Sequence, residues 1–102
     1  MNINDYQDNV RQFSTYHKEL GPFQLILDLT YNTGVLNNKL YNILQDKQGE
    51  FTNEEKIKLA ISLGDIINNI ANMASDLNIT MEEILALNIK KIELSQKNTV
   101  IQ

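Results

Sequence analysis

Polar side chains recur at intervals of three and four residues in the second half of the sequence, at Ser62, Asp65, Asn69, Asn72 and Asp76. In a helix, this spacing places all five side chains on one side. Carboxylate and amide oxygens bind hard cations and hydrogen-bond to polar ligands. Two interpretations are open: the ridge is either the solvent-exposed side of an amphipathic helix or a polar surface that faces a ligand.

Other reactive groups are scarce. The sequence contains no cysteine, which excludes disulfides, zinc–thiolate sites and thiol nucleophiles. Its one histidine, His17, has no convincing serine and acid partners, and we interpret it as a packing residue. The four glycines are isolated from one another, so the sequence has no glycine-rich phosphate loop.

Length and charge narrow the class of protein. The 102 residues predict one domain, 1–102, with a frayed tail from about 96–102. The net charge is −4 and the basic residues are scattered, so we expect no binding to DNA or RNA. No apolar run approaches the roughly 20 residues of a membrane span. The N-terminus resembles no targeting signal, so we expect a cytoplasmic protein without membrane contact.

Four helical segments are expected, at about 3–18, 22–46, 52–77 and 80–96. Thr52 with Glu55, and Thr80 with Glu83, have the spacing of capping boxes that begin the last two helices. The broad apolar face behind Thr52 predicts a central helix packed on more than one side. The second segment is ambiguous, because its residues 25–31 alternate in polarity and residues 32–34 suit a hairpin turn.

Several stretches resemble the MazG-like nucleotide pyrophosphohydrolases. Residues 63–67 are similar to the family's second metal motif, and residues 77–91 to its closing helix, with Asn88 and Lys91 as an Asn-x-x-Lys signature. Residues 29–35 fall where the family has its first motif. The resemblance spans about residues 2–95. It implies an all-α bundle of four to five helices, helical at 22–46, that forms a dimer or a tetramer through its long central helices.

The resemblance also implies a chemistry. Proteins of this family hold magnesium between facing helices with the carboxylates of two motifs, and the metal activates a water that splits a nucleoside triphosphate. The positions of those carboxylates are largely changed here. The first motif's glutamates fall on Tyr31, Asn32 and Val35, and the first acid of the second motif falls on Ser62.

Few metal ligands remain at these positions. Asp65 matches the second motif, and Asp28, one turn before Asn32, is a candidate substitute. The candidate metal ligands are therefore Asp65, which the resemblance implies, and Asp28, which matches no ligand of the family motif. The implied nucleotide-binding residues are Asn32, Asn88 and Lys91.

Three functions follow as alternatives. We expect a protein that has lost metal-dependent hydrolysis, needs no cofactor, and binds a nucleotide or a protein target. The first alternative is an active Mg²⁺-dependent (d)NTP pyrophosphohydrolase with rearranged ligands, which releases a nucleoside monophosphate and pyrophosphate. The second is a structural or inhibitory helical protein of a phage or mobile element that binds a host target.

Overall fold

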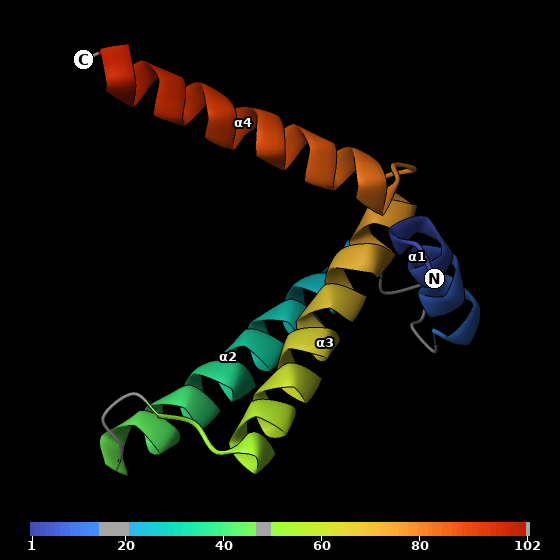
Figure 1. Cartoon of the computed structure of the whole chain (residues 1–102). Helices are drawn as coiled ribbons and strands as arrows, with labels where there is room; N and C mark the ends of the chain where they lie inside the picture. The colour runs from blue at the N-terminus through green and yellow to red at the C-terminus, as the bar shows by residue number, and fades with distance from the viewer. Residues whose placement is uncertain (15–20, 47–49, 102) are drawn as a thin grey trace.

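The computed structural model describes residues 1–14, 21–46 and 50–101, and within these ranges the chain forms four helices and no strand (Figure 1). They are α1 (Ile3–Phe13), α2 (Pro22–Asp46), α3 (Asn53–Asp76) and α4 (Met81–Ile101). The expected all-α class is confirmed for this part of the chain. The alternative hairpin at residues 25–40 is wrong, because these residues lie inside α2.

Helix α1 is shorter than expected. Its N-cap is Asn2, whose side chain accepts the Asp5 N–H over 2.8 Å. The helix ends at Phe13 instead of about residue 18, because Ser14 takes an extended conformation with φ −70° and ψ 132°. His17 lies outside the described residues.

The starts of α3 and α4 follow the capping signals. The Thr52 hydroxyl accepts the Glu55 N–H over 3.1 Å, and the Glu55 carboxylate accepts the Thr52 N–H over 2.8 Å. At α4, the Thr80 hydroxyl accepts the Glu83 N–H over 3.1 Å. Helix α4 continues to Ile101, past the point near residue 96 where we expected the tail to begin.

The helices divide into a hairpin and an arm (Figure 1). Helices α2 and α3 run antiparallel, α1 packs beside the C-terminal end of α3, and α4 leaves that junction and points away from the hairpin. The buried core is small and lies at the junction, where Ala71, Ala74 and Met81 meet partly buried residues of α1, the α3–α4 turn and α4.

Helix α3 contacts both α1 and α2, yet much of its apolar surface stays uncovered. The expectation of a central helix packed on more than one side is confirmed, since α3 contacts both α1 and α2. The large exposed residues of α3 are Ile57, Ile61, Leu63, Ile67 and Ile70. Among the described residues, no helix combines the length and the apolar character that crossing a membrane requires.

Candidate functional site

A polar hollow of about 360 Å³ lies where the end of α1 meets α2 and α3. Its size falls in the range of small-molecule sites, about 300–1,000 Å³. Most of its lining side chains are amides or carboxylates, which donate and accept hydrogen bonds. The lining consists of Phe13, Ser14, Gln24, Leu25, Asp28, Asn32, Asp65, Asn68, Asn69 and Asn72.

Two asparagines join the walls of the hollow. Asn32 Nδ2 on α2 donates to Asn69 Oδ1 on α3 over 2.7 Å. Asn69 is buried and Asn32 is half-buried. This hydrogen bond leaves the Asn32 oxygen and the Asn69 amide nitrogen as further polar groups at the hollow.

Asn72 lines the hollow and has a buried acceptor without a hydrogen-bond partner. The residue is 5% exposed, and its Oδ1 has no hydrogen-bond partner. Its Nδ2 donates to Asn68 Oδ1 over 3.1 Å. A buried polar atom without a partner costs free energy, about 1–3 kcal/mol. An N–H or O–H group that reached this atom would recover that cost.

The charged groups that line the hollow are both acidic, Asp28 and Asp65. Asp65 acts beyond the hollow, on Tyr6 of α1. Burial, and then the negative charge of Asp65, raise the pKa of the Tyr6 hydroxyl above 10.0. Both effects disfavour the phenolate, so Tyr6 is neutral at physiological pH.

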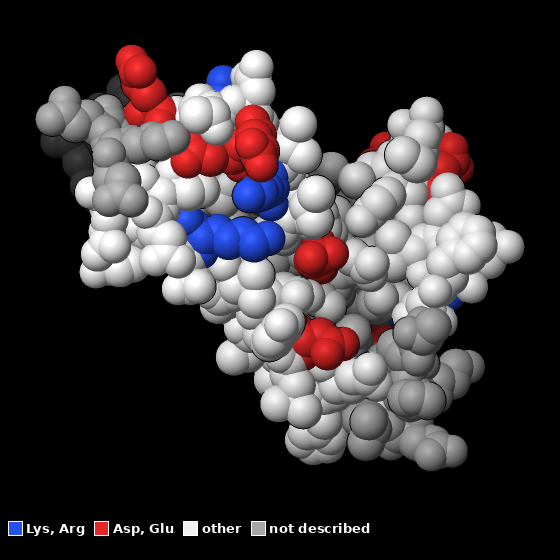
Figure 2. Space-filling view, turned by 90° about the horizontal axis from the view of Figure 1, so that it is seen from below, with Lys and Arg blue, Asp and Glu red and all other residues white. Residues whose placement is uncertain are grey.

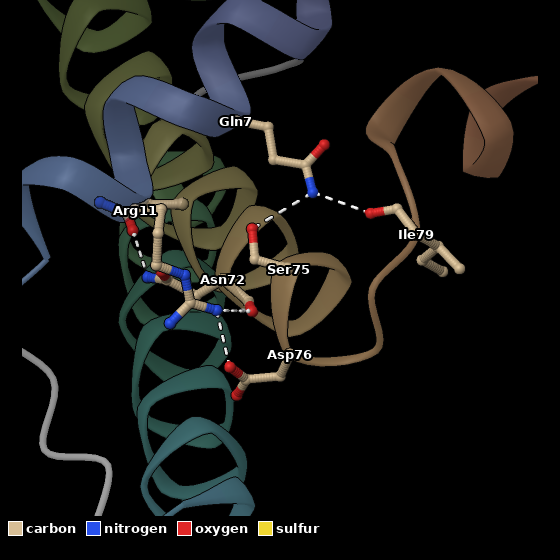
Figure 3. Close-up of polar contacts among 7 residues, drawn as sticks. Gln7, Arg11, Asn72, Ser75, Asp76 and Ile79 are labelled. Atoms are coloured by element: carbon tan, nitrogen blue, oxygen red, sulfur yellow. Dashed lines mark hydrogen bonds and ion pairs between the residues drawn. The ribbon is translucent and has the colours of Figure 1, made fainter.

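An ion pair fixes α1 at the edge of the hollow (Figure 3). Arg11 Nη2 donates to the Asn72 carbonyl oxygen over 2.7 Å and to Asp76 Oδ1 over 2.6 Å. The side chains of Arg11 and Asp76 are 31% and 28% exposed, so the pair is partly shielded from solvent. Arg11 thereby ties α1 to the same turn of α3 that presents Asn72.

A second polar contact between α2 and α3 lies farther along the hairpin. Lys39 Nζ donates to Ser62 Oγ over 2.7 Å, and Ser62 is 2% exposed. Ser62 is the position where the resemblance implies a metal-binding glutamate. Here its hydroxyl accepts a hydrogen bond from Lys39. Neither Ser62 nor Lys39 lines the hollow.

The structure brings some predicted site residues together and separates others. Asp28, Asn32 and Asp65 all line the hollow. Asn88 and Lys91 are exposed on α4 and do not line it. The polar ridge of α3 is not simply solvent-exposed, since Ser62, Asn69 and Asn72 are buried; that interpretation is wrong for these three residues.

Sequence reasoning missed several residues. Gln24 and Asn68 line the hollow, as do Phe13 and Ser14 from the end of α1. No local signal marks them, because the hollow forms only where three helices meet. The sequence did offer a signal for Lys39 as a polar contact, because it is the one cationic residue between positions 22 and 46.

The donor set does not fit a pair of magnesium ions. Such a pair needs several carboxylates, and the lining supplies Asp28 and Asp65. Within the described ranges, no group of three or more histidine, aspartate or glutamate side chains is arranged to hold a metal ion.

A known protein is similar to this chain. Over 76 residues the chain is 30% identical to the Gene 37 protein of Mycobacterium phage L5. The matched segment covers 74% of this chain and 67% of the phage protein. The chain belongs to the Gene 37 protein family. No family model and no solved structure matches it. The name of the Gene 37 protein states no activity, so a MazG-like kinship of this family stays a prediction.

Proposed function

We propose that this Gene 37 family protein binds a nucleotide or nucleoside in the polar hollow and does not hydrolyse it. The observation that carries the proposal is the Asn72 Oδ1 atom, which is buried and lacks a partner, in a residue that lines the hollow. A base amino group or a ribose hydroxyl is a donor of the kind this atom lacks.

The charge of the lining determines which part of a nucleotide fits. Asp28 and Asp65 repel phosphates, whereas the amides of Asn32, Asn68 and Asn69 both donate and accept. We therefore propose that base and sugar enter the hollow and that the phosphates stay toward solvent. Asn88 and Lys91, which the resemblance implies as nucleotide-binding residues, are exposed on α4 and do not line the hollow, so no contact with this ligand is proposed for them.

The loss of hydrolysis is proposed on the same grounds. Two carboxylates do not neutralise the two magnesium ions that the MazG-like reaction uses, and Asn32 and Ser62 are engaged in hydrogen bonds to Asn69 and Lys39. No reaction step is assigned to any residue of the hollow.

The test is a ligand panel with two readouts. Thermal unfolding is followed with nucleosides and (d)NTPs in EDTA and in Mg²⁺, and pyrophosphate release is measured on the same samples. We expect a higher Tm with at least one ligand in EDTA, because a ligand at 100 times its Kd stabilises the native state by about 2.7 kcal/mol. Pyrophosphate release would instead establish the active enzyme, and no Tm shift with any ligand would overturn the binding proposal.

The phage relative favours a second candidate function, a structural or inhibitory protein that binds a host target. The large exposed side chains of α2, such as Phe23, Leu27 and Tyr31, offer a surface for it. A chain that shows neither a Tm shift nor turnover, yet forms a stable complex with a component of host lysate, would establish this function.

A further inference from the structure

Helix α4 projects from the molecule without cover from its own chain (Figure 1). Met81 is buried and Ile84 half-buried, but every residue from Leu85 to Lys97 is exposed. In proteins, most of a helix's stability comes from the packing of an apolar face and not from helix propensity. Residues 85–97 have no such packing in their own chain.

Specific hydrogen bonds hold this helix away from the hairpin. The Gln7 side chain donates to Ser75 Oγ and to the Ile79 carbonyl, over 3.2 and 2.9 Å (Figure 3), and accepts the Met81 N–H over 2.8 Å. The turn before α4 places Asn78 at φ 59°, a left-handed conformation. The direction of α4 is thus set by contacts with α1 and α3.

One side of α4 carries an apolar stripe. Leu85, Ile89 and Ile92 are 49%, 55% and 47% exposed, and their spacing places them on one face. On the opposite face, Lys91 lies between Leu87 and Leu94, so that face has no continuous apolar stripe. Figure 2 shows a face of the molecule on which uncharged residues predominate and charged residues form a few clusters. We take the stripe Leu85–Ile89–Ile92 as the contact face of α4.

Helix α3 carries a stripe of the same spacing. Leu63, Ile67 and Ile70 are 49%, 41% and 36% exposed. Beside Ile67 lies an apolar groove of about 320 Å³, lined by Met1, Asn2, Ile3, Tyr6, Gly64 and Ile67. A Cβ atom added at Gly64 would meet nothing within 4 Å, so the groove is open there.

The exposed area of the chain is large enough for an interface with a partner. The chain exposes 8124 Å², whereas a compact protein of 11.7 kDa exposes about 5,900 Å². Its radius of gyration is 16.8 Å, against about 12.8 Å for a compact domain of this length. The excess of about 2,200 Å² is larger than the roughly 800 Å² that each partner buries in a standard interface.

We propose that α4 of one copy packs through Leu85, Ile89 and Ile92 on the α3 stripe and the Gly64 groove of a second copy, and that the second copy does the same in return. Each copy carries both the α4 stripe and the α3 stripe. A two-fold symmetric pair therefore covers both stripes of both copies. The proposal does not depend on what the polar hollow binds.

Matched variants test this contact. We expect a dimer by sedimentation equilibrium, and Ile89→Glu should raise its Kd by about 100-fold, as loss of a central apolar contact does. Lys90→Glu places the same charge one residue away and should change the Kd by about threefold or less. Gly64→Leu should weaken the dimer, whereas Gly34→Leu, at another open helical glycine, should not.

Mixing the variants separates this arrangement from other dimers. A chain with Ile89→Glu and a chain with Gly64→Leu retain one intact contact between them, the natural α4 on the natural α3. The mixture should therefore associate more tightly than either variant alone. A monomeric natural chain, equal effects of Ile89→Glu and Lys90→Glu, or no gain on mixing would overturn the proposal.

Hydrogen exchange on the natural chain keeps the test independent of variant folding. The amides of residues 85–92 should gain protection as the protein concentration rises through the Kd, because packing of α4 stabilises its helix. Protection that does not change with concentration would contradict the exchange of α4 between copies.

Discussion

The side-chain amide of Asn32 on α2 donates to the side-chain oxygen of Asn69 on α3 over 2.7 Å. An asparagine pair thus joins the two helices at a position where the MazG-like resemblance implies a glutamate that binds metal. An amide both donates and accepts but carries no charge. The hydrogen bond holds the hairpin together and leaves the hollow suited to polar ligands.

Removal of Asn32 should weaken the hairpin. Asn32→Ala leaves the buried Asn69 Oδ1 without its donor, and we expect a loss of about 1 kcal/mol in the free energy of unfolding, at the low end for an orphaned acceptor because the hollow admits water. Urea unfolding measures the change. Asn37→Ala, at an exposed asparagine of the same helix, is the control and should change stability by about 0.5 kcal/mol or less.

Removal of Asn72 should separate stability from binding. Asn72→Ala deletes the unpartnered Oδ1 atom, but it also deletes the Nδ2 hydrogen bond to Asn68. The two effects oppose each other, so the free energy of unfolding should change by about 1 kcal/mol or less. The ligand-dependent Tm shift should disappear, because the atom that accepts from the ligand is gone. Thermal unfolding with and without ligand measures both. Asn42→Ala, at an exposed position of α2, should keep the shift; a shift retained by Asn72→Ala would argue against the hollow as the site.

Gln7 should be a major contributor to stability. It is 6% exposed and forms three hydrogen bonds that link α1 to Ser75, Ile79 and Met81. Gln7→Ala orphans the Met81 N–H in the core, and we expect a loss of about 2–3 kcal/mol. Chemical denaturation measures it. Gln12→Ala, exposed on the same helix, should change little, and equal effects of the two substitutions would contradict the role of Gln7.

Tyr6 should make the protein less stable in alkali. The pKa of its hydroxyl is raised in the folded state by burial and by Asp65, above the 10.0 of the unfolded chain. Below pH 10 both states are protonated and stability is full. As the pH rises from about 10 through the folded-state pKa, the unfolded state loses its proton first, so stability falls.

The measurement is the slope of the unfolding free energy against pH above 10. Tyr6→Phe should flatten this slope, because phenylalanine has no proton to lose. Tyr31→Phe, at a ring that is 71% exposed, is the control and should leave the slope as in the natural chain. An unchanged slope in Tyr6→Phe would refute the assignment.

Local signals predicted the helices well where the chain supplies its own caps. The Thr52–Glu55 box begins α3 as expected, since both partners lie within one turn. The end of α1 could not be predicted, because Ser14 is no strong stop signal and tertiary contacts decide where the chain departs. The start of α4 is similar: Gln7 and Asn4 accept the N–H groups of Met81 and Glu82 across more than 70 residues of sequence.

The sequence by itself determined the helical class, most helix positions and the residue types of the site, because hydrophobic periodicity and capping act within a few residues. Through the MazG-like resemblance it also indicated Asp28, Asn32 and Asp65, which line the hollow. Only the tertiary structure decided that Asn69 and Asn72 are buried beside them, and that Asn88 and Lys91 are carried away on α4. The physical reason is that burial and helix direction depend on contacts between distant segments, which periodicity does not encode.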